Sequence, residues 1–179
     1  MAFMRIISGI YKNRELLTPD NKKTHPMGDR EKLALFNMLL PYLPSKIVLD
    51  AFSGSGALGI ESLSHGASKV IFVEKIPKIA KIIEKNLKSL AIPPENYELR
   101  VKDVNKIDFP EEKFDVILAD PPYDNFKIKE IESLVKFLKP AGILALSSPK
   151  NAPEPLFETL ELLKSKTYAA ARISLFKKI

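Results

Sequence analysis

The stretch from Ile47 to Glu61 constrains the fold of this chain more than any other. It begins with a short run of aliphatic residues, reaches Asp50, passes through glycines spaced as G-x-G-x-x-G, and continues as a helical pattern. A strand that leads through a tight glycine turn into a helix N-terminus lets backbone N–H groups approach a nucleotide-like ligand. We therefore predict a nucleotide-binding turn in this stretch.

The charge of this turn indicates which kind of ligand it accepts. The same glycine spacing occurs in dinucleotide-binding proteins, and Glu74 stands twenty residues beyond Gly54, as it would there. Asp50 departs from that pattern, because a carboxylate at the start of the turn would repel a pyrophosphate. It would attract a ligand that carries an ammonium or sulfonium group. The pattern therefore favours S-adenosylmethionine over NAD.

Composition excludes several classes of protein. The chain has 179 residues, 45% of them hydrophobic and 28% charged, which is ordinary for one globular domain. It contains no cysteine and two histidines, so disulfides and the usual metal sites are not expected. No apolar run approaches the roughly 20 residues of a membrane span, and the first residues lack a signal-peptide pattern. We therefore expect a cytoplasmic protein without a metal ion or a membrane anchor.

The positive charge is concentrated at the two ends of the chain. Residues 1–32 carry seven Lys and Arg against four Asp and Glu, and residues 139–179 carry seven against three. The middle of the chain, which contains the glycine turn, has fourteen against fifteen. An excess of basic residues on both flanks favours a polyanionic partner, and nucleic acid is the obvious one.

From Lys46 onward, strand and helix patterns alternate regularly. Strands are predicted at 47–51, 70–73, 97–101, 114–119 and 143–146, and helices at 57–64, 77–90 and 128–138. The residues of the helix at 77–90 that we expect to face inward are Ile79, Ile82, Ile83 and Leu87. This alternation predicts an α/β fold with a doubly wound, mostly parallel sheet that is covered on both faces.

The N-terminal part departs from this alternation. Residues 4–8 and 14–17 are typical of a β-hairpin, and residues 18–28 form a polar, turn-rich loop. Asp29 is the expected N-cap of the following helix. The apolar stripe predicted for that helix consists of Leu33, Phe36, Leu39 and Leu40. We therefore treat residues 1–28 as a hairpin and loop appended to a single domain at 29–179.

The C-terminal part of the chain also departs from the regular alternation of strands and helices. After two prolines there is room only for a short helix at 156–159. Residues 160–168 and 170–177 then read as two strands joined by a tight connection. Since no helix separates them, they must pair antiparallel.

Asp120-Pro121-Pro122-Tyr123 follows the fourth predicted strand of the alternating part. In a doubly wound sheet this loop lies at the same edge as the glycine turn. The Asp120 carboxylate and the Pro121 carbonyl could each accept an N–H of an exocyclic amine, leaving the nitrogen lone pair directed outward. Tyr123 could stack on the base that carries the amine. Because a sulfonium is already an excellent leaving group, alignment and local electrostatics would suffice for methyl transfer.

These motifs resemble those of the class I methyltransferases that modify exocyclic amines. The likeness extends to the RsmD family through Met4-Arg5-Ile6-Ile7-Ser8-Gly9, His25-Pro26-Met27-Gly28-Asp29-Arg30 and Leu35-Phe36-Asn37. That family methylates N2 of a guanine in small-subunit (16S) ribosomal RNA. The resemblance implies a Rossmann-like, seven-stranded sheet with the last strand antiparallel. It also implies S-adenosylmethionine as methyl donor and ribosomal RNA, within a small-subunit assembly, as partner.

The resemblance assigns roles to individual residues. Asp50 and the backbone of Gly54 and Gly56 would hold the methionine end of the cofactor, and Phe52 belongs to the same motif. Glu74 would accept hydrogen bonds from the ribose hydroxyls, and Asp103 would lie near the adenine amine. The residues with catalytic roles would be Asp120, Pro121, Pro122 and Tyr123.

Several basic residues of the N-terminal part are candidates for RNA contact: Arg5, Lys12, Arg14, His25 and Arg30. The chain departs from the family pattern at His25, where an arginine is usual, and at Glu31, where an aliphatic residue is common. Ser147-Ser148 stands where an acidic residue often follows the fifth strand, and the hairpin at 167–172 lacks its usual glycine. These departures concern RNA contact more than cofactor binding.

Three alternatives remain beside methylation of ribosomal RNA. A DNA adenine-N6 methyltransferase can use the same Asp-Pro-Pro-Tyr motif, but such enzymes must read a duplex and extrude a base, usually with an added domain. An NAD-linked oxidoreductase would explain the glycines but not Asp50. An RNA-binding or assembly factor without activity would not need an intact amine-binding loop. The motifs say nothing about oligomeric state.

Overall fold

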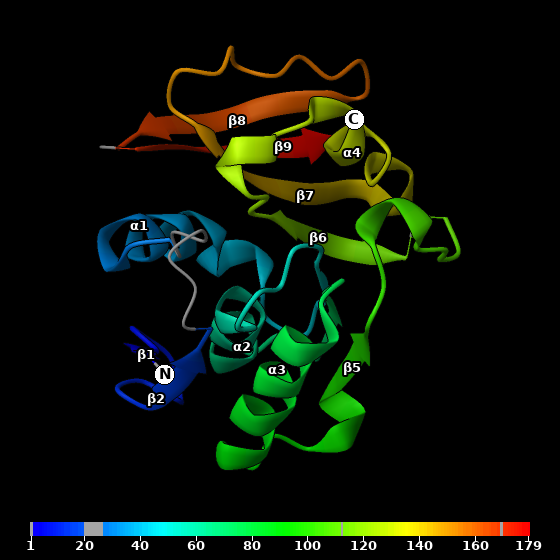
Figure 1. Ribbon diagram of the computed structural model, residues 1–179. Helices are drawn as coiled ribbons and strands as arrows, with labels where there is room; N and C mark the ends of the chain where they lie inside the picture. Colours follow the sequence, from blue (N-terminus) through cyan, green and yellow to red (C-terminus); the bar gives the residue numbers. More distant parts are fainter. Residues whose placement is uncertain (1, 20–26, 112, 169) are drawn as a thin grey trace.

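The central feature of the computed structural model, which describes residues 2–19, 27–111, 113–168 and 170–179, is a seven-stranded sheet (Figure 1). Its strand order is β5-β4-β3-β6-β7-β9-β8. The strands are β3 (Ile47–Asp50), β4 (Lys69–Val73), β5 (Tyr97–Arg100), β6 (Phe114–Ala119), β7 (Leu138–Pro149), β8 (Leu160–Thr167) and β9 (Ala171–Lys178). The first five are mutually parallel, and β9 runs antiparallel to both of its neighbours. The predicted doubly wound sheet with an antiparallel last strand is confirmed.

This topology determines where a ligand can bind. The strand order reverses at β3, which pairs with β4 on one side and with β6 on the other. Ligands of open α/β sheets bind beyond the carboxyl ends of the strands at such a switch point. The loops that follow β3, β4, β5 and β6 therefore meet at one edge of the sheet.

Helices cover both faces of the sheet. On one face, α1 (Asp29–Leu39), α2 (Ala57–Ser64) and α3 (Pro77–Ser89) contribute to one apolar cluster with the strands. On the other face, α4 (Ile128–Glu132) contributes to a second cluster. Short 3-10 helices occupy Leu40–Tyr42, Pro94–Asn96, Val104–Lys106, Tyr123–Asn125 and Val135–Phe137.

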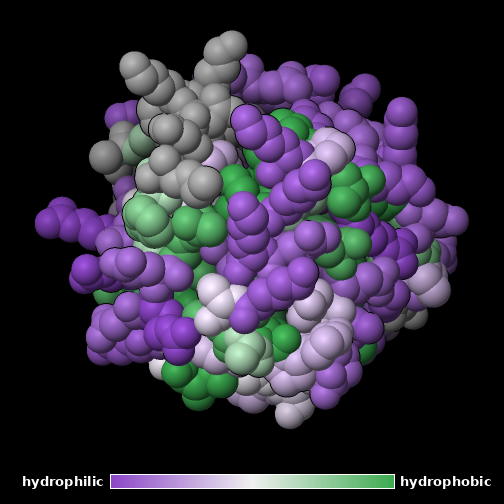
Figure 2. Space-filling model, turned by 60° about the horizontal axis from the view of Figure 1, so that its bottom comes forward, coloured by the Kyte–Doolittle hydropathy of each residue, from purple (hydrophilic) through white to green (hydrophobic). Residues whose placement is uncertain are grey.

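Gly59 explains how closely α2 packs on the sheet. A Cβ atom at this position would lie 2.3 Å from Cε1 of Phe72, a buried side chain of β4. Only glycine allows this approach, which matches the helix–strand packing role of the third glycine in G-x-G-x-x-G. On the face of the molecule seen in Figure 2, hydrophilic side chains prevail, with apolar areas between them. Within the described ranges, every helix is too short or too polar to cross a bilayer.

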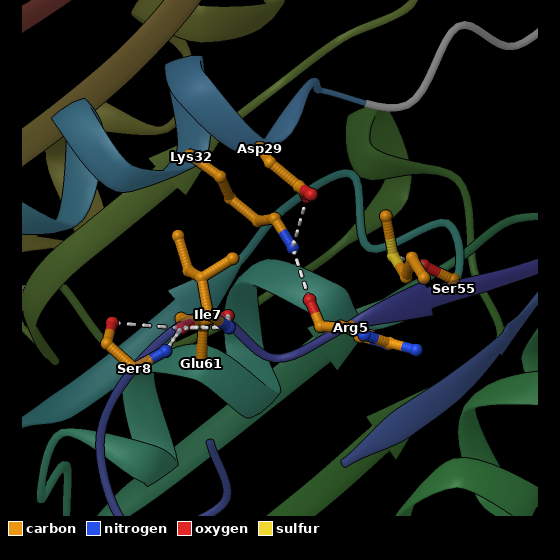
Figure 3. Close-up of polar contacts among 8 residues, drawn as sticks. Arg5, Ile7, Ser8, Asp29, Lys32, Ser55 and Glu61 are labelled. Carbon is orange, nitrogen blue, oxygen red and sulfur yellow. Dashed lines mark hydrogen bonds and ion pairs between the residues drawn. The ribbon is translucent and has the colours of Figure 1, made fainter. Parts of the chain in front are cut away.

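The N-terminal hairpin is present, but its first strand lies earlier than predicted. β1 (Ala2–Arg5) pairs antiparallel with β2 (Glu15–Thr18), whereas the sequence indicated residues 4–8 and 14–17. Ile6 still exchanges backbone hydrogen bonds with Asn13 and Arg14. The chain leaves the hairpin after Ile6, because the backbone N–H groups of Ile7 and Ser8 donate to the buried Glu61 carboxylate of α2 (Figure 3).

The predicted details of α1 are partly wrong. Gly28, with an extended backbone, occupies the N-cap position, and Asp29 is the first helical residue, 3.7 Å from the Lys32 ammonium. Leu33 is 47% exposed and Leu40 42% exposed, so neither belongs to the buried stripe. The buried side chains of α1 are instead Lys32, Leu35, Phe36 and Leu39. In α3 the inward positions are as predicted except for Ile82, which is only half-buried.

Three predicted boundaries in the C-terminal half are also wrong. The helix predicted at 128–138 ends as α4 at Glu132. Beyond it, the Leu134 N–H donates to the carbonyl of Ile131, three residues earlier, so the α-helical hydrogen-bond pattern does not continue. β7 then begins at Leu138 and includes Pro140, with an irregular register before Ile143. Residues 156–159 form no helix, and the Phe157 ring instead packs edge-on against Phe176 at 5.0 Å.

Candidate active site

The glycine turn after β3 is shaped by hydrogen bonds and by two left-handed glycines. Gly54 has φ = 53° and Gly56 has φ = 80°, a conformation that other residues rarely adopt. The Ser53 hydroxyl donates to the Asp50 carbonyl at 2.8 Å and accepts from the Val73 N–H at 2.9 Å. A Cβ atom built on Gly54 would meet no heavy atom within 4 Å. Hydrogen bonds of Ser53 therefore fix the conformation of the turn, while the space next to Gly54 stays open.

Asp50 lies behind this turn. It is 1% exposed, and its Oδ2 atom accepts the Gly59 N–H at 3.0 Å. The pKa of Asp50 is raised to about 7, mainly by burial and to a smaller extent by the nearby Asp120 and Glu74 carboxylates, although the Gly59 hydrogen bond lowers it. Asp50 is not among the described residues that line the adjacent cavity. Its carboxylate therefore acts on that cavity through its charge and through the turn it supports.

The raised pKa of Asp50 predicts an unusual pH dependence of stability. Between about pH 4 and pH 7 the folded protein keeps a proton on Asp50 that the unfolded chain has released. The free energy of unfolding should therefore fall as pH rises across this window, by about 4 kcal/mol from this group alone. Asp50→Asn, which keeps an acceptor for the Gly59 N–H, should match the wild type near pH 4 and exceed it in stability near pH 8. Urea unfolding of both ligand-free proteins across this range measures the difference, and a difference independent of pH would contradict the assignment.

Glu74 and Asp103 follow β4 and β5 and both line the cavity. Glu74 accepts the Gly54 N–H on Oε2 at 3.0 Å and the Ile76 N–H on Oε1 at 2.8 Å, and burial raises its pKa. Asp103 accepts the backbone and side-chain N–H groups of Asn105, which lower its pKa. Each carboxylate is oriented by its own loop and keeps lone pairs for a further donor.

The Asp120-Pro121-Pro122-Tyr123 loop follows β6. Asp120 is partly buried, and desolvation raises its pKa to about 6, although hydrogen bonding to Ser147 lowers it. The Tyr123 hydroxyl lies 2.5 Å from the Ser147 hydroxyl, and burial raises the pKa of Tyr123 to about 12. At neutral pH the loop therefore presents a carboxylate beside a protonated phenol.

One cavity of about 380 Å³ brings these loops together. Of the candidate site residues, its walls contain Phe52, Gly54, Glu74, Asp103, Asp120, Pro121, Pro122 and Tyr123. Gly56 does not line the cavity. Its left-handed backbone lies at the N-terminus of α2, and a Cβ at this position would be 3.1 Å from the Ile83 side chain. A volume of this size is typical of small-molecule sites.

The four candidate RNA-binding residues that the structure describes do not line this cavity. Arg5, Lys12, Arg14 and Arg30 are exposed, and His25 lies outside the described residues. Arg5 stands 3.8 Å from the Glu15 carboxylate across the hairpin. The Arg14 guanidinium donates to the Ser89 carbonyl at the end of α3, so it also ties the hairpin to the domain.

Sequence reasoning missed Lys32. It is 1% exposed, lines the cavity, and donates from Nζ to the Arg5 carbonyl at 2.8 Å (Figure 3). Its position relative to Leu35, Phe36 and Leu39 places it on the buried side of α1. That helical spacing was the signal that could have revealed it.

The sheet order, the glycine turn and the carboxylate after β6 define a class I methyltransferase. The chain belongs to the RsmD family: the family model described as "Conserved hypothetical protein 95" matches residues 4–177. Ribosomal RNA small subunit methyltransferase D of Haemophilus influenzae is 35% identical over 97% of this chain and 93% of its own. The protein of that name in Escherichia coli K12 is 33% identical over 79% and 70%.

Solved structures agree with this assignment. The yhhF protein of E. coli has a TM-score of 0.86 at 25% identity, covering 99% of this chain and 98% of its own. The H. influenzae protein HI0767 has a TM-score of 0.83 at 31% identity and covers 99% of both chains. An S-adenosylmethionine-dependent methyltransferase of Mesorhizobium loti shares the fold, with a TM-score of 0.68 at 14% identity over 84% of this chain and 99% of its own. The protein is thus a methyltransferase, not the NAD-linked oxidoreductase that the glycines alone would allow.

Proposed function

We propose that the protein transfers a methyl group from S-adenosylmethionine to the N2 amine of a guanine in small-subunit (16S) ribosomal RNA. The observation that carries this proposal is one cavity lined by both the glycine turn after β3 and the Asp120 loop after β6. A methyl donor and an amine must meet in line within one site, and both loops line the same cavity. The relatives named ribosomal RNA small subunit methyltransferase D support the choice of RNA.

The residues of the cavity fit this cofactor. The open space in front of Gly54 leaves room for a ligand against the backbone, and the walls of the cavity contain the carboxylates of Glu74, Asp103 and Asp120 together with several lysines. Glu74 would hold the ribose hydroxyls, Asp103 the adenine amine, and the backbone of the turn the methionine end. The Asp50 charge behind the turn suits a cationic ligand better than a pyrophosphate. When bound, the cofactor supplies a methyl group on a sulfonium, which is an excellent leaving group.

The Asp120 loop would orient the target amine for methyl transfer. The Asp120 carboxylate and the Pro121 carbonyl would each accept one N–H, so that the nitrogen lone pair points away from both acceptors. Since the pKa of Asp120 is about 6, the carboxylate is mostly ionised above pH 7 and can accept. Stacking of the base on Tyr123 would contribute about 1–3 kcal/mol and would set the plane of the base.

The basic N-terminal part would dock the RNA. We place Arg5, Lys12, Arg14, His25 and Arg30 on this surface, with ribosomal RNA within a small-subunit assembly in the cytoplasm as the partner. Binding of RNA to phosphate contacts releases counterions, so affinity should fall steeply with salt. Lys12→Gln and Arg30→Gln should each lower the slope of log affinity against log salt by about one.

Fluorescence titrations of a 16S RNA fragment at several salt concentrations measure these slopes. Lys129→Gln is the control, because Lys129 is also exposed but lies on α4, against the other face of the sheet. Equal slopes for all three variants and the wild type would refute this docking surface.

The proposed function is tested by methylation of 16S ribosomal RNA in vitro and by mass mapping of that RNA from cells that lack the protein. We expect a single N2-methylguanosine to appear in vitro and the same one to be missing in the cells. Methylation of adenine N6 in DNA but not of RNA would favour the DNA methyltransferase alternative. RNA binding without any methyl transfer would favour an assembly factor.

A further inference from the structure

Ser147 occupies a position that the proposed mechanism does not yet use. β6 and β7 are parallel neighbours, and Ala119 of β6 pairs with Leu146 of β7. Asp120 and Ser147 are therefore the next residues along two adjacent strands, at the edge of the sheet where the ligand cavity lies. Ser147 is buried, so its hydroxyl can interact only with groups of its immediate surroundings.

Two partners surround this hydroxyl. The Tyr123 hydroxyl is 2.5 Å from the Ser147 hydroxyl, and the register of β6 and β7 places Asp120 beside Ser147, where hydrogen bonding to Ser147 lowers the pKa of the Asp120 carboxyl. An ionised carboxylate can only accept hydrogen bonds, so Ser147 must donate to Asp120. The Ser147 oxygen is then left to accept the O–H of Tyr123, which is protonated because its pKa is about 12. The hydrogen bonds run in one direction, from Tyr123 through Ser147 to Asp120.

We propose that Ser147 is a positioning residue that fixes the Tyr123 ring and the Asp120 carboxylate relative to each other. The ring would define the plane of the target base, and the carboxylate would accept one N–H of its amine. A link between the two would align the amine with the plane of the base before the methyl group is transferred. The catalytic consequence rests on the proposed function, whereas the link among the three side chains rests on the short contact between Tyr123 and Ser147 and on the register that places Ser147 beside Asp120.

The neighbouring Ser148 offers a matched control. Successive side chains of a strand point to opposite faces, so Ser148 faces away from Asp120. It is 1% exposed, and its hydroxyl has no hydrogen-bond partner among the residues that the structure describes. Ser148→Ala therefore removes the same atom from the same strand without touching the link between Tyr123 and Asp120.

The direct test is a carbon-13 NMR titration of the Asp120 carboxyl in the ligand-free protein. Other ionisable groups around it are Asp50 of β3, Tyr123 of the same loop, and Glu31 of α1, which faces Tyr123. All of these remain in Ser147→Ala, which removes only the hydrogen bond. The Asp120 pKa should rise above its wild-type value by about 0.5–1 unit in Ser147→Ala and stay unchanged in Ser148→Ala.

Steady-state kinetics provides the second readout. Ser147→Ala should lower kcat by about tenfold or more with little change in the KM for RNA, and should shift the acid limb of the rate profile to higher pH. Tyr123→Phe, which keeps the ring and removes the hydroxyl, should lower kcat in the same way, and it serves as the second variant if Ser147→Ala folds poorly.

The possible outcomes separate this inference from the proposed function. An Asp120 carboxyl that titrates identically in Ser147→Ala and in the wild type overturns the inference, whatever the activity. A raised pKa with an unchanged kcat overturns the positioning role. If the wild type transfers no methyl group to RNA, the proposed function fails, and the titration alone still decides the hydrogen-bond arrangement.

Discussion

Replacing Asp120 by alanine is expected to reduce methyl transfer by about a hundred- to a thousandfold, the usual effect of removing one preorganised group that stabilises a transition state. The change removes an acceptor for the amine without touching the glycine turn, Glu74 or Asp103. Binding of S-adenosylhomocysteine should therefore stay within about tenfold of the wild type. A small change in affinity is expected because the Asp120 charge also reaches Asp50 behind the turn.

Single-turnover methylation and isothermal titration calorimetry measure these two quantities separately. Asp108→Ala is the control, because it makes the same change at an exposed aspartate that does not line the cavity. An active Asp120→Ala enzyme would exclude the role of that carboxylate. A complete loss of cofactor binding would place Asp120 in the cofactor site instead of the amine site.

Glu61→Ala is expected to lower the free energy of unfolding by about 3–5 kcal/mol, the usual loss when one partner of a buried charged pair is removed. Glu61 is fully buried and accepts the N–H of Ile7 at 3.0 Å, the N–H of Ser8 at 2.8 Å and the Ser8 hydroxyl at 3.2 Å (Figure 3). The Lys32 charge also acts on it. Without the carboxylate, the backbone N–H groups of Ile7 and Ser8 would lose their acceptor, and the buried Lys32 ammonium would keep only the more distant Asp29 as a counter-charge.

Urea unfolding of Glu61→Ala and of the control Glu84→Ala tests this expectation. Glu84 is an exposed residue of α3, and its removal should change stability by less than about 0.5 kcal/mol. Amide hydrogen exchange should also accelerate at Ile7 and Ser8 in Glu61→Ala before it does so in the central strands. A loss below about 1 kcal/mol would mean that the N-terminal segment is held mainly by its apolar contacts.

The parallel core of the fold could be predicted from the sequence because buried parallel strands are continuous apolar runs. Val70 to Val73 is such a run, and the glycines and prolines beside these runs mark where the strands end. The predicted strands of the parallel part lie within two residues of the observed ones, except β7. Residues 128–138 were misassigned because Ile131, Leu134, Val135 and Leu138 are buried whether the chain forms one helix or a short helix and a strand.

The candidate site was predictable only where a residue belongs to a local motif. The turn from Asp50 and the loop from Asp120 have such motifs, and the topology places both at one edge of the sheet. Ser147, Lys32 and Glu61 belong to no such motif, since the hydrogen-bond partners cited for them lie 24 to 54 residues away in the chain. The pairing of these buried polar groups can be identified only once the helices and strands are packed together.

The attachment of the N-terminal segment has an evolutionary consequence. Glu61 binds the amides of Ile7 and Ser8, and Lys32 binds the carbonyl of Arg5, so both charged side chains grip the main chain. Every amino acid except proline offers the same amide and carbonyl. Exposed side chains of this segment, such as that of Arg5, can therefore change without releasing the main chain, whereas the buried Ile6 cannot.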